Sequence, residues 1–129
     1  MIKERQAEPE KSWLEGKWDE ICRLMDELSY DPYIDDQIEI DMIWELAEEI
    51  IKSEKRKEAS WEARKKIVLA IIQGDGFDEY GVIDPMTDLL KALPVTKEEK
   101  LACADLVQKY GDSFMKRYAL PLFRKTEQN

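Results

Sequence analysis

The sequence predicts an all-α protein of about six helices, arranged as a compact bundle or a short, α-solenoid-like helical repeat. Apolar side chains recur at the three- and four-residue spacing of helices, and no stretch alternates with period two for long enough to predict a strand. The five Gly and five Pro cluster at the boundaries of the periodic segments, which favours long regular elements. The length fits a single domain over residues 1–129. We expect residues 1–11 and 124–129 to be frayed.

The first helix is predicted over residues 12–29. It begins with a capping box, in which the Ser12 hydroxyl and the Glu15 carboxylate satisfy the first free backbone N–H groups. Pro32 marks its end, because the residue before a proline avoids the α region. The side chains at helical spacing that should face the core are Leu14, Trp18, Ile21, Met25 and Leu28.

A second helix, over residues 35–55, is apolar around a wide arc. Nine of its apolar side chains cover about 200° of the circumference, so we expect neighbouring elements to cover this helix on several sides. The nine are Ile38, Ile40, Met42, Ile43, Trp44, Leu46, Ala47, Ile50 and Ile51. The remaining face is almost purely acidic. It carries what we call the acidic strip: Asp41, Glu45, Glu48 and Glu49.

A connector and two further helices follow. Residues 52–60 mix basic and acidic side chains, and we interpret them, with the basic residues just beyond, as a solvated connector. Ser60 is placed to cap a helix over residues 61–73. The next helix is predicted to start at Asp84-Pro85, an N-cap followed by proline at the first helical position, where its missing N–H costs nothing.

The last two helices have clear start signals. Thr96 and Glu99 form a second capping box, and Gly111 stands where a C-cap is expected. Ser113 can start the final helix. Pro121 removes a backbone donor within it, so we expect a kink or an early end there.

The second half of the chain carries a set of residues that resembles known proteins. They are Trp61, Arg64, the stretch 77–81, Asp84–Met86, Asp88–Leu89 and the run Glu99–Asp105. Through them residues 61–123, about half of the chain, resemble helical segments of uncharacterised bacterial proteins with solenoid-like helix pairs. The resemblance implies paired helices and brings no catalytic residues. The third and fifth helices start about 36 residues apart, near the repeat length of helical solenoids. Whether the helix pairs are true repeats stays open.

The negative charge of the chain is concentrated in one block. Residues 24–51 hold ten acidic side chains and no Lys or Arg, whereas the rest of the chain is nearly balanced within a formal net charge of −9. Such a block repels phosphate and anionic membranes and attracts basic partners. The candidate partner-binding residues are therefore the acidic strip, with Trp44 at its edge. We expect no nucleic-acid or membrane partner.

These features favour a non-enzymatic protein-interaction module that docks a partner with a basic surface. A sharper version is an inhibitor or immunity-type protein whose acidic strip occupies the nucleic-acid channel of a nuclease. Self-association, in which the basic residues between 52 and 66 meet the strip of a second copy, stays open. Two other hypotheses are a carboxylate metal-binding protein or enzyme, and a structural helical module of a larger assembly.

Several kinds of chemistry are excluded by composition. The chain has no histidine, which removes histidine-activated nucleophiles and histidine-ligated metals, and Cys22 and Cys103 alone cannot form a four-thiolate zinc site. We expect no catalytic residue, cofactor or metal, and two reduced, packed thiols. The Gly- and Asp-rich loop over residues 74–84 is interpreted as a connector pinned by Phe77 and Tyr80, with ligand binding as the alternative. No secretory signal or long apolar run is visible, so we expect a cytoplasmic protein.

Overall fold

The computed structural model describes residues 12–28, 36–74, 77 and 81–128, with side chains to Phe123 except those of Tyr118 and Leu122. Over these residues it is built from helices and their connections, which confirms the all-α prediction. The elements are α1 (Trp13–Glu27), α2 (Gln37–Lys52), the 3₁₀ helix η2 (Glu54–Glu58), α3 (Trp61–Gln73), α4 (Ile83–Ala92), α5 (Lys97–Tyr110) and α6 (Ser113–Gln128).

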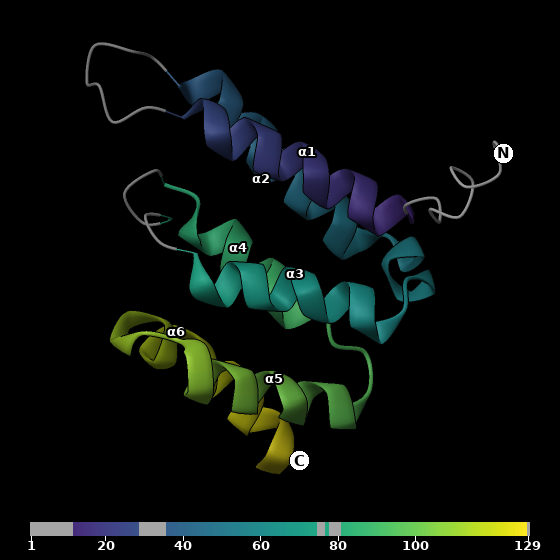
Figure 1. Ribbon diagram of the computed structural model, residues 1–129, viewed down its shortest axis with the longest axis vertical. Coiled ribbons are helices and arrows are strands. Elements are labelled where there is room, and N and C mark those ends of the chain that lie inside the picture. Colours follow the sequence, from purple (N-terminus) through teal and green to yellow (C-terminus); the bar gives the residue numbers. More distant parts are fainter. Residues whose placement is uncertain (1–11, 29–35, 75–76, 78–80, 129) are drawn as a thin grey trace, which may run out of the picture.

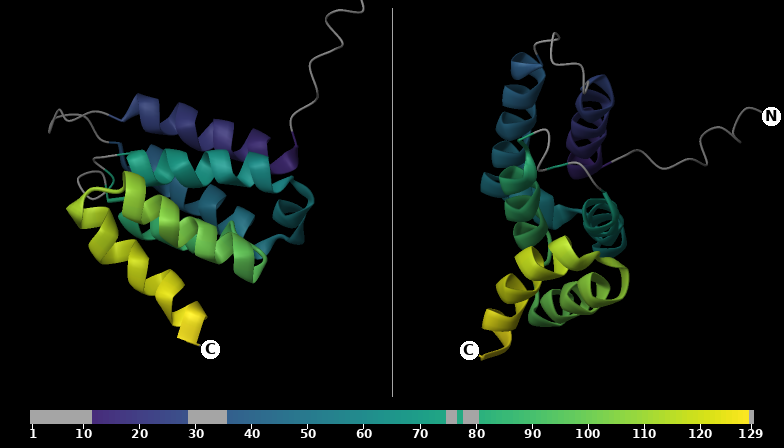
Figure 2. Two further views of the ribbon diagram at one scale, coloured as in Figure 1. Left: turned by 60° about the horizontal axis from the view of Figure 1, so that its bottom comes forward. Right: turned by 90° about the vertical axis from the view of Figure 1, so that its left-hand side faces the viewer.

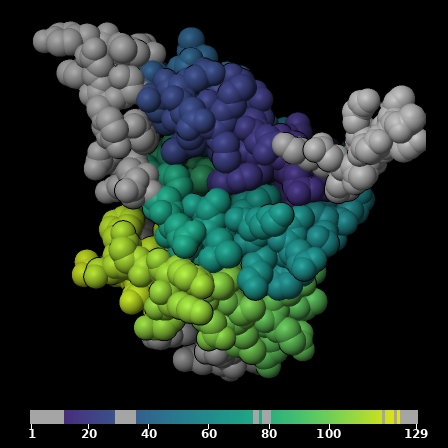
Figure 3. Space-filling view, viewed as in Figure 1, coloured from purple at the N-terminus to yellow at the C-terminus, as the bar shows by residue number. Residues whose placement is uncertain are grey.

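The six α-helices form three successive pairs. Helix α1 packs against α2, α3 against α4, and α5 against α6. The pairs stack so that α1, α3 and α5 form one row and α2, α4 and α6 form a second (Figures 1 and 2). Figure 3 shows the pairs following one another in sequence order across one face, from purple through teal to green and yellow. This stacking of helix pairs is the arrangement of a short α-solenoid.

The hydrophobic core lies between the two rows and draws on every helix. In α3 the side chains of Ile67, Val68, Ile71 and Ile72 are buried, while Trp61 is partly buried against the core. The inner face of α4 is completely buried. Its members are Met86, Leu89, Leu90 and Leu93, each 0% exposed.

The capping signals at Ser12, Ser60 and Thr96 are confirmed. Ser12 with Glu15 and Thr96 with Glu99 both form complete capping boxes. The Ser60 hydroxyl accepts a hydrogen bond from the backbone N–H of Ala63 at 3.1 Å. These contacts are local, which is why sequence spacing alone locates them.

Two predicted helix boundaries are corrected. Helix α4 begins at Ile83 with Val82 at the cap, so Asp84 lies inside the helix and is not its N-cap. The helix starts early because the buried Val82 already accepts a hydrogen bond from Met86 N–H at 3.1 Å. Pro85 still lies within the first turn, where no intrahelical N–H is needed. Helix α2 spans Gln37–Lys52 rather than residues 35–55.

The end of α5 and the course of α6 differ in detail from expectation. Gly111 caps α5 as predicted, but with an extended backbone (φ −76°, ψ 149°) rather than a left-handed one. The Asp112 carboxylate accepts from Met115 N–H at 2.8 Å, so Asp112 supplies the start signal just before Ser113. Pro121 lies inside α6 (Ser113–Gln128) and does not end it.

The expectation that α2 is covered on several sides is wrong. Only Ile43, Ala47 and Ile50 are buried, whereas Ile38 is 70% exposed and Met42 is 39% exposed. Helices α1 and α4 contact α2 from two sides and leave its outer face open. Part of the apolar arc of α2 is therefore exposed to solvent, and its exposed residues lie next to the acidic strip.

The interpretation of the basic connector as solvated is also wrong for Arg64, which is 6% exposed. Its guanidinium binds the Glu99 carboxylate through two nitrogen–oxygen contacts of 2.5 and 3.2 Å. It also donates to the carbonyl oxygens of Ala59 (3.2 Å) and Leu93 (3.0 Å). One side chain thus joins the start of α3, the end of α4 and the first turn of α5.

Arg56 in η2 has a similar role one helix pair earlier. It donates to the carbonyl oxygens of Ile51 and Ser53, at 3.0 and 2.8 Å, and to that of Ala92 at 3.0 Å. These carbonyls lie at or next to the C-terminal ends of α2 and α4, where helices lack intrahelical partners. Arg56 therefore holds the two helix ends together.

We predict that Arg64→Met lowers the free energy of unfolding by about 3–5 kcal/mol, because it leaves the Glu99 carboxylate partly buried without its cation. Arg23→Met is the matched control. Arg23 forms exposed ion pairs with Glu20 and Glu27, and exposed pairs contribute roughly 0–1 kcal/mol. Urea unfolding of both variants measures the difference. Equal losses would show that Arg64 has no special role in the fold.

The same pair predicts a pH dependence of stability. The hydrogen bond from Arg64 is the main cause that lowers the pKa of Glu99 from 4.5 to about 2, against the opposing effect of burial. A lowered pKa stabilises the fold above the unfolded-state value, and that stability is lost as the pH falls from 4.5 toward 2. Glu99→Gln should therefore be less stable than the wild type at pH 7, with a gap that narrows over this range in urea titrations. A gap that stays constant would contradict the assignment.

Candidate functional site

The acidic strip lies on the open outer face of α2. Asp41, Glu45, Glu48 and Glu49 are all exposed, and they fall on one side of the helix because they are spaced at three and four residues. Helix α1 borders the strip on the side of Glu49, and α4 borders it on the side of Glu48. The structure thus keeps the four predicted residues together on one surface.

Two of the four carboxylates take part in ion pairs. Glu48 pairs with Lys52 one turn later at 3.2 Å, and Glu49 pairs with Lys17 of α1 at 2.8 Å. The first pair follows from helical spacing. The second joins residues far apart in the sequence, so spacing could not predict it. Exposed pairs of this kind contribute only about 0–1 kcal/mol, so both carboxylates stay available to a partner.

The other two carboxylates differ from these. Asp41 accepts a hydrogen bond from the Gln37 amide at 2.8 Å, a neutral partner that leaves its charge in place. Glu45 has no hydrogen bond or ion pair with any other described residue. The middle of the strip is therefore its least compensated part.

Trp44 is a partly exposed side chain held in one position. It belongs to the apolar arc of α2 that was expected to be covered, but its side chain is 43% exposed. Its indole N–H donates to the carbonyl oxygen of Gly81 at 3.0 Å, which ties α2 to the segment before α4. Gly81 has φ +78°, a backbone conformation that favours glycine. An aromatic side chain already fixed in this way loses little conformational entropy when a partner covers it.

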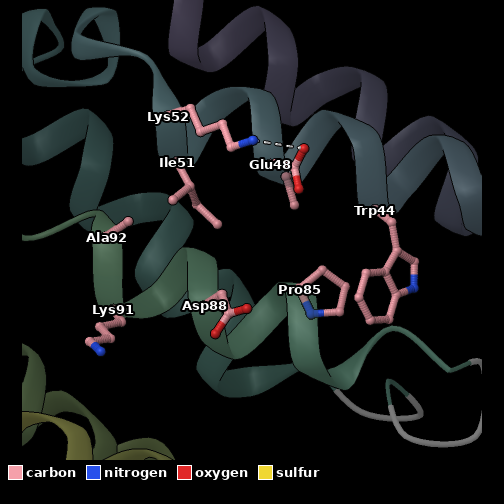
Figure 4. Close-up of a pocket in the computed structure, with 9 residues that line it drawn as sticks. Trp44, Glu48, Ile51, Lys52, Pro85, Asp88, Lys91 and Ala92 are labelled. Carbon is pink, nitrogen blue, oxygen red and sulfur yellow. Dashed lines mark hydrogen bonds and ion pairs between the residues drawn. The ribbon is translucent and has the colours of Figure 1, made fainter.

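A groove runs between α2 and α4 beside Trp44 (Figure 4). We call it the α2–α4 groove. It has a volume of about 480 Å³, within the roughly 300–1,000 Å³ of typical ligand sites. It is lined by Trp44, Ala47, Glu48, Ile51, Lys52, Pro85, Asp88, Lys91 and Ala92.

The groove combines an apolar floor with charged edges. Ala47, Ile51 and Pro85 supply much of the apolar lining. Trp44 stands at one end next to Pro85 (Figure 4). Glu48 on α2 and Asp88 on α4 border it from opposite sides. A second hollow, on the other side of Trp44, is bordered by acidic strip residues Asp41 and Glu45. Trp44 thus separates two hollows that are each flanked by carboxylates.

Sequence reasoning found one wall of this groove and missed the other. Trp44 and Glu48 were candidates because they share a helix with the strip. Asp88 and Pro85 lie about 40 residues further along, and only the packing of α4 against α2 brings them there. Their sequence context is that of an ordinary helix start, which carries no sign of a groove.

The described residues also bear on metal binding, membrane insertion and the Gly- and Asp-rich loop. Within the described part of the chain, no group of three or more His, Cys, Asp or Glu side chains could hold a metal ion. None of the helices described is both long and apolar enough to cross a membrane. Of the loop's two expected anchors, Phe77 is buried and Tyr80 lies outside the described residues.

We predict that Trp44 is the tryptophan most accessible to a collisional quencher, because Trp13, Trp18 and Trp61 are packed against the core. Trp44→Phe should lower the slope of acrylamide quenching. Trp18→Phe is the matched control and should leave the slope unchanged or raise it. Equal slopes in the two variants would contradict the exposed position of Trp44.

Comparisons of this chain with protein-family models, curated proteins and solved structures find no match. Its function is therefore inferred from its own residues.

Proposed function

We propose that the protein is a non-enzymatic interaction module that docks a partner with a basic surface on the outer face of α2. The observation that supports this most directly is the position of Trp44, which is exposed and hydrogen-bonded to Gly81 beside exposed carboxylates. Its two free cysteines, Cys22 and Cys103, fit a reducing cytoplasmic setting, which we include in the proposal.

Trp44 and the carboxylates around it would contribute differently to such binding. A pre-positioned tryptophan beside a hollow is typical of the few residues that dominate interface affinity. The carboxylates around it would accelerate association with a cationic surface and favour one class of partner over others. Lys52 is held only by an exposed pair, so it can move away from Glu48 at small cost. Lys17 is held more firmly, because its side chain is 29% exposed and its ammonium also lies 5.7 Å from the centre of the Trp13 ring.

A more specific form of the proposal is an inhibitor or immunity-type protein that occupies the nucleic-acid channel of a nuclease. From Asp41 to Glu49 the strip extends about 12 Å along the helix axis. A single nucleic-acid strand places about three to four phosphates over that length. The strip could therefore present negative charge at a spacing similar to that of the substrate backbone.

The test is a variant with the strip neutralised: Asp41→Asn, Glu45→Gln, Glu48→Gln and Glu49→Gln. A matched control neutralises four exposed acids elsewhere: Asp26→Asn, Glu58→Gln, Glu62→Gln and Asp105→Asn. Both variants change the net charge equally. Each is used to capture partners from extracts of cells that express the protein, with quantitative mass spectrometry as the readout.

We expect the control to retain a basic partner that the strip variant loses. Four exposed charge contacts of roughly 0.2–1 kcal/mol each predict a loss of affinity for the purified partner between about fourfold and a thousandfold. Affinity should also fall steeply with added salt. If both variants retain the same partners, the strip is not the docking surface, and a structural role in a larger assembly becomes the better hypothesis.

A further inference from the structure

We propose that the α2–α4 groove binds an arginine side chain of the partner, with the guanidinium between Glu48 and Asp88 and against the ring of Trp44. This inference rests on the proposed function and identifies the partner's anchoring residue. It adds Asp88, on a different helix, to the residues that recognise the partner.

The groove has the two surfaces that a long cationic side chain needs. Its floor at Ala47, Ile51 and Pro85 is apolar, which suits the methylene stem. Glu48 and Asp88 then border the position of the charged head from opposite sides (Figure 4). Trp44 stands at the end of the floor, where its ring can contact a cation. The groove therefore offers contacts to both parts of the side chain.

Asp88 presents an exposed carboxylate on the α4 side of the groove. It forms no hydrogen bond or ion pair with another residue of the described chain. It is also the sixth residue of α4, beyond the first turn where the helix dipole favours a carboxylate. Its carboxylate is therefore accessible to a positively charged ligand in the groove.

Of the two lysines that line the groove, one pairs with a lining carboxylate. Lys91 points away from the groove in Figure 4. Lys52 pairs with Glu48 at 3.2 Å, but the two side chains are 73% and 67% exposed. An exposed pair contributes about 0–1 kcal/mol, so an incoming guanidinium can share or displace it.

Arginine fits this site better than lysine for a geometric reason. Its planar guanidinium has five N–H donors, which can bond two carboxylates on opposite sides while one face stacks on an aromatic ring. An ammonium group is compact and strongly hydrated, and it would satisfy one carboxylate at a time. The groove should therefore discriminate between the two cations.

The test uses blocked dipeptides as probes, followed by ¹⁵N–¹H NMR of the full chain. The probes are acetyl-Arg-Leu-amide, acetyl-Lys-Leu-amide and acetyl-Gln-Leu-amide. The readout is the indole N–H signal of Trp44, which a Trp44→Phe sample identifies. We expect the arginine probe to shift this signal and to bind about tenfold more tightly than the glutamine probe, with lysine between them.

Single substitutions then locate the site. Asp88→Asn and Glu48→Gln should each weaken arginine binding by about three- to tenfold. Asp41→Asn is the matched control, because it removes the same charge from the second hollow, outside the groove. It should change the affinity by less than about twofold. Circular dichroism confirms that each variant keeps its helices.

The outcomes separate this inference from the proposed function. If the probes bind equally, or if Asp41→Asn weakens binding as much as Asp88→Asn does, the groove is not an arginine site. A partner captured through the acidic strip would still support the docking proposal in that case. If the arginine probe binds in the groove but the strip variant, which includes Glu48→Gln, keeps every partner, the groove can bind arginine but is not where the partner docks.

Discussion

The buried contact between Arg64 and Glu99 is the interaction on which the stacking of the helix pairs most depends. A guanidinium removed from water is stable only when its donors are satisfied. Arg64 meets this need with the Glu99 carboxylate and with backbone oxygens of Ala59 and Leu93. No buried side-chain polar atom is left without a partner within the described residues. The geometry of three helices is thus specified by one side chain, which apolar packing alone would leave freer to slide.

A second arginine, Arg56, positions the two helices that form the α2–α4 groove. Arg56 binds carbonyl oxygens at the C-terminal ends of α2 and α4, and so fixes the distance between the helices that form the groove. At the opposite end of the groove, the indole of Trp44 binds Gly81 just before α4. Hydrogen bonds therefore hold the groove at both ends. Arg56 binds the end of α4, and Trp44 binds Gly81 just before the start of α4. A binding surface built on such supports needs little rearrangement when a ligand enters.

Much of the fold was predictable because its signals are local. The capping boxes at Ser12 and Thr96 and the buried face of α4 depend on spacings of three and four residues. The start of α4 was missed, since the contacts of Val82 competed with the good capping sequence at Asp84. Only half of the candidate site could be predicted from the sequence. The acidic strip shares one helix, whereas Asp88 joins the groove only through packing between helices.

By itself, the sequence determined the helices, their caps and the acidic face of α2, because helical periodicity places side chains on faces without reference to other elements. It also excluded histidine chemistry. Only the tertiary structure decided which apolar residues of α2 are covered, that Arg64 is buried rather than solvated, and that Glu48 lies across a groove from Asp88. Each of these depends on contacts between different helices. Such contacts leave no periodic signal, because their geometry is set by how the helix pairs stack.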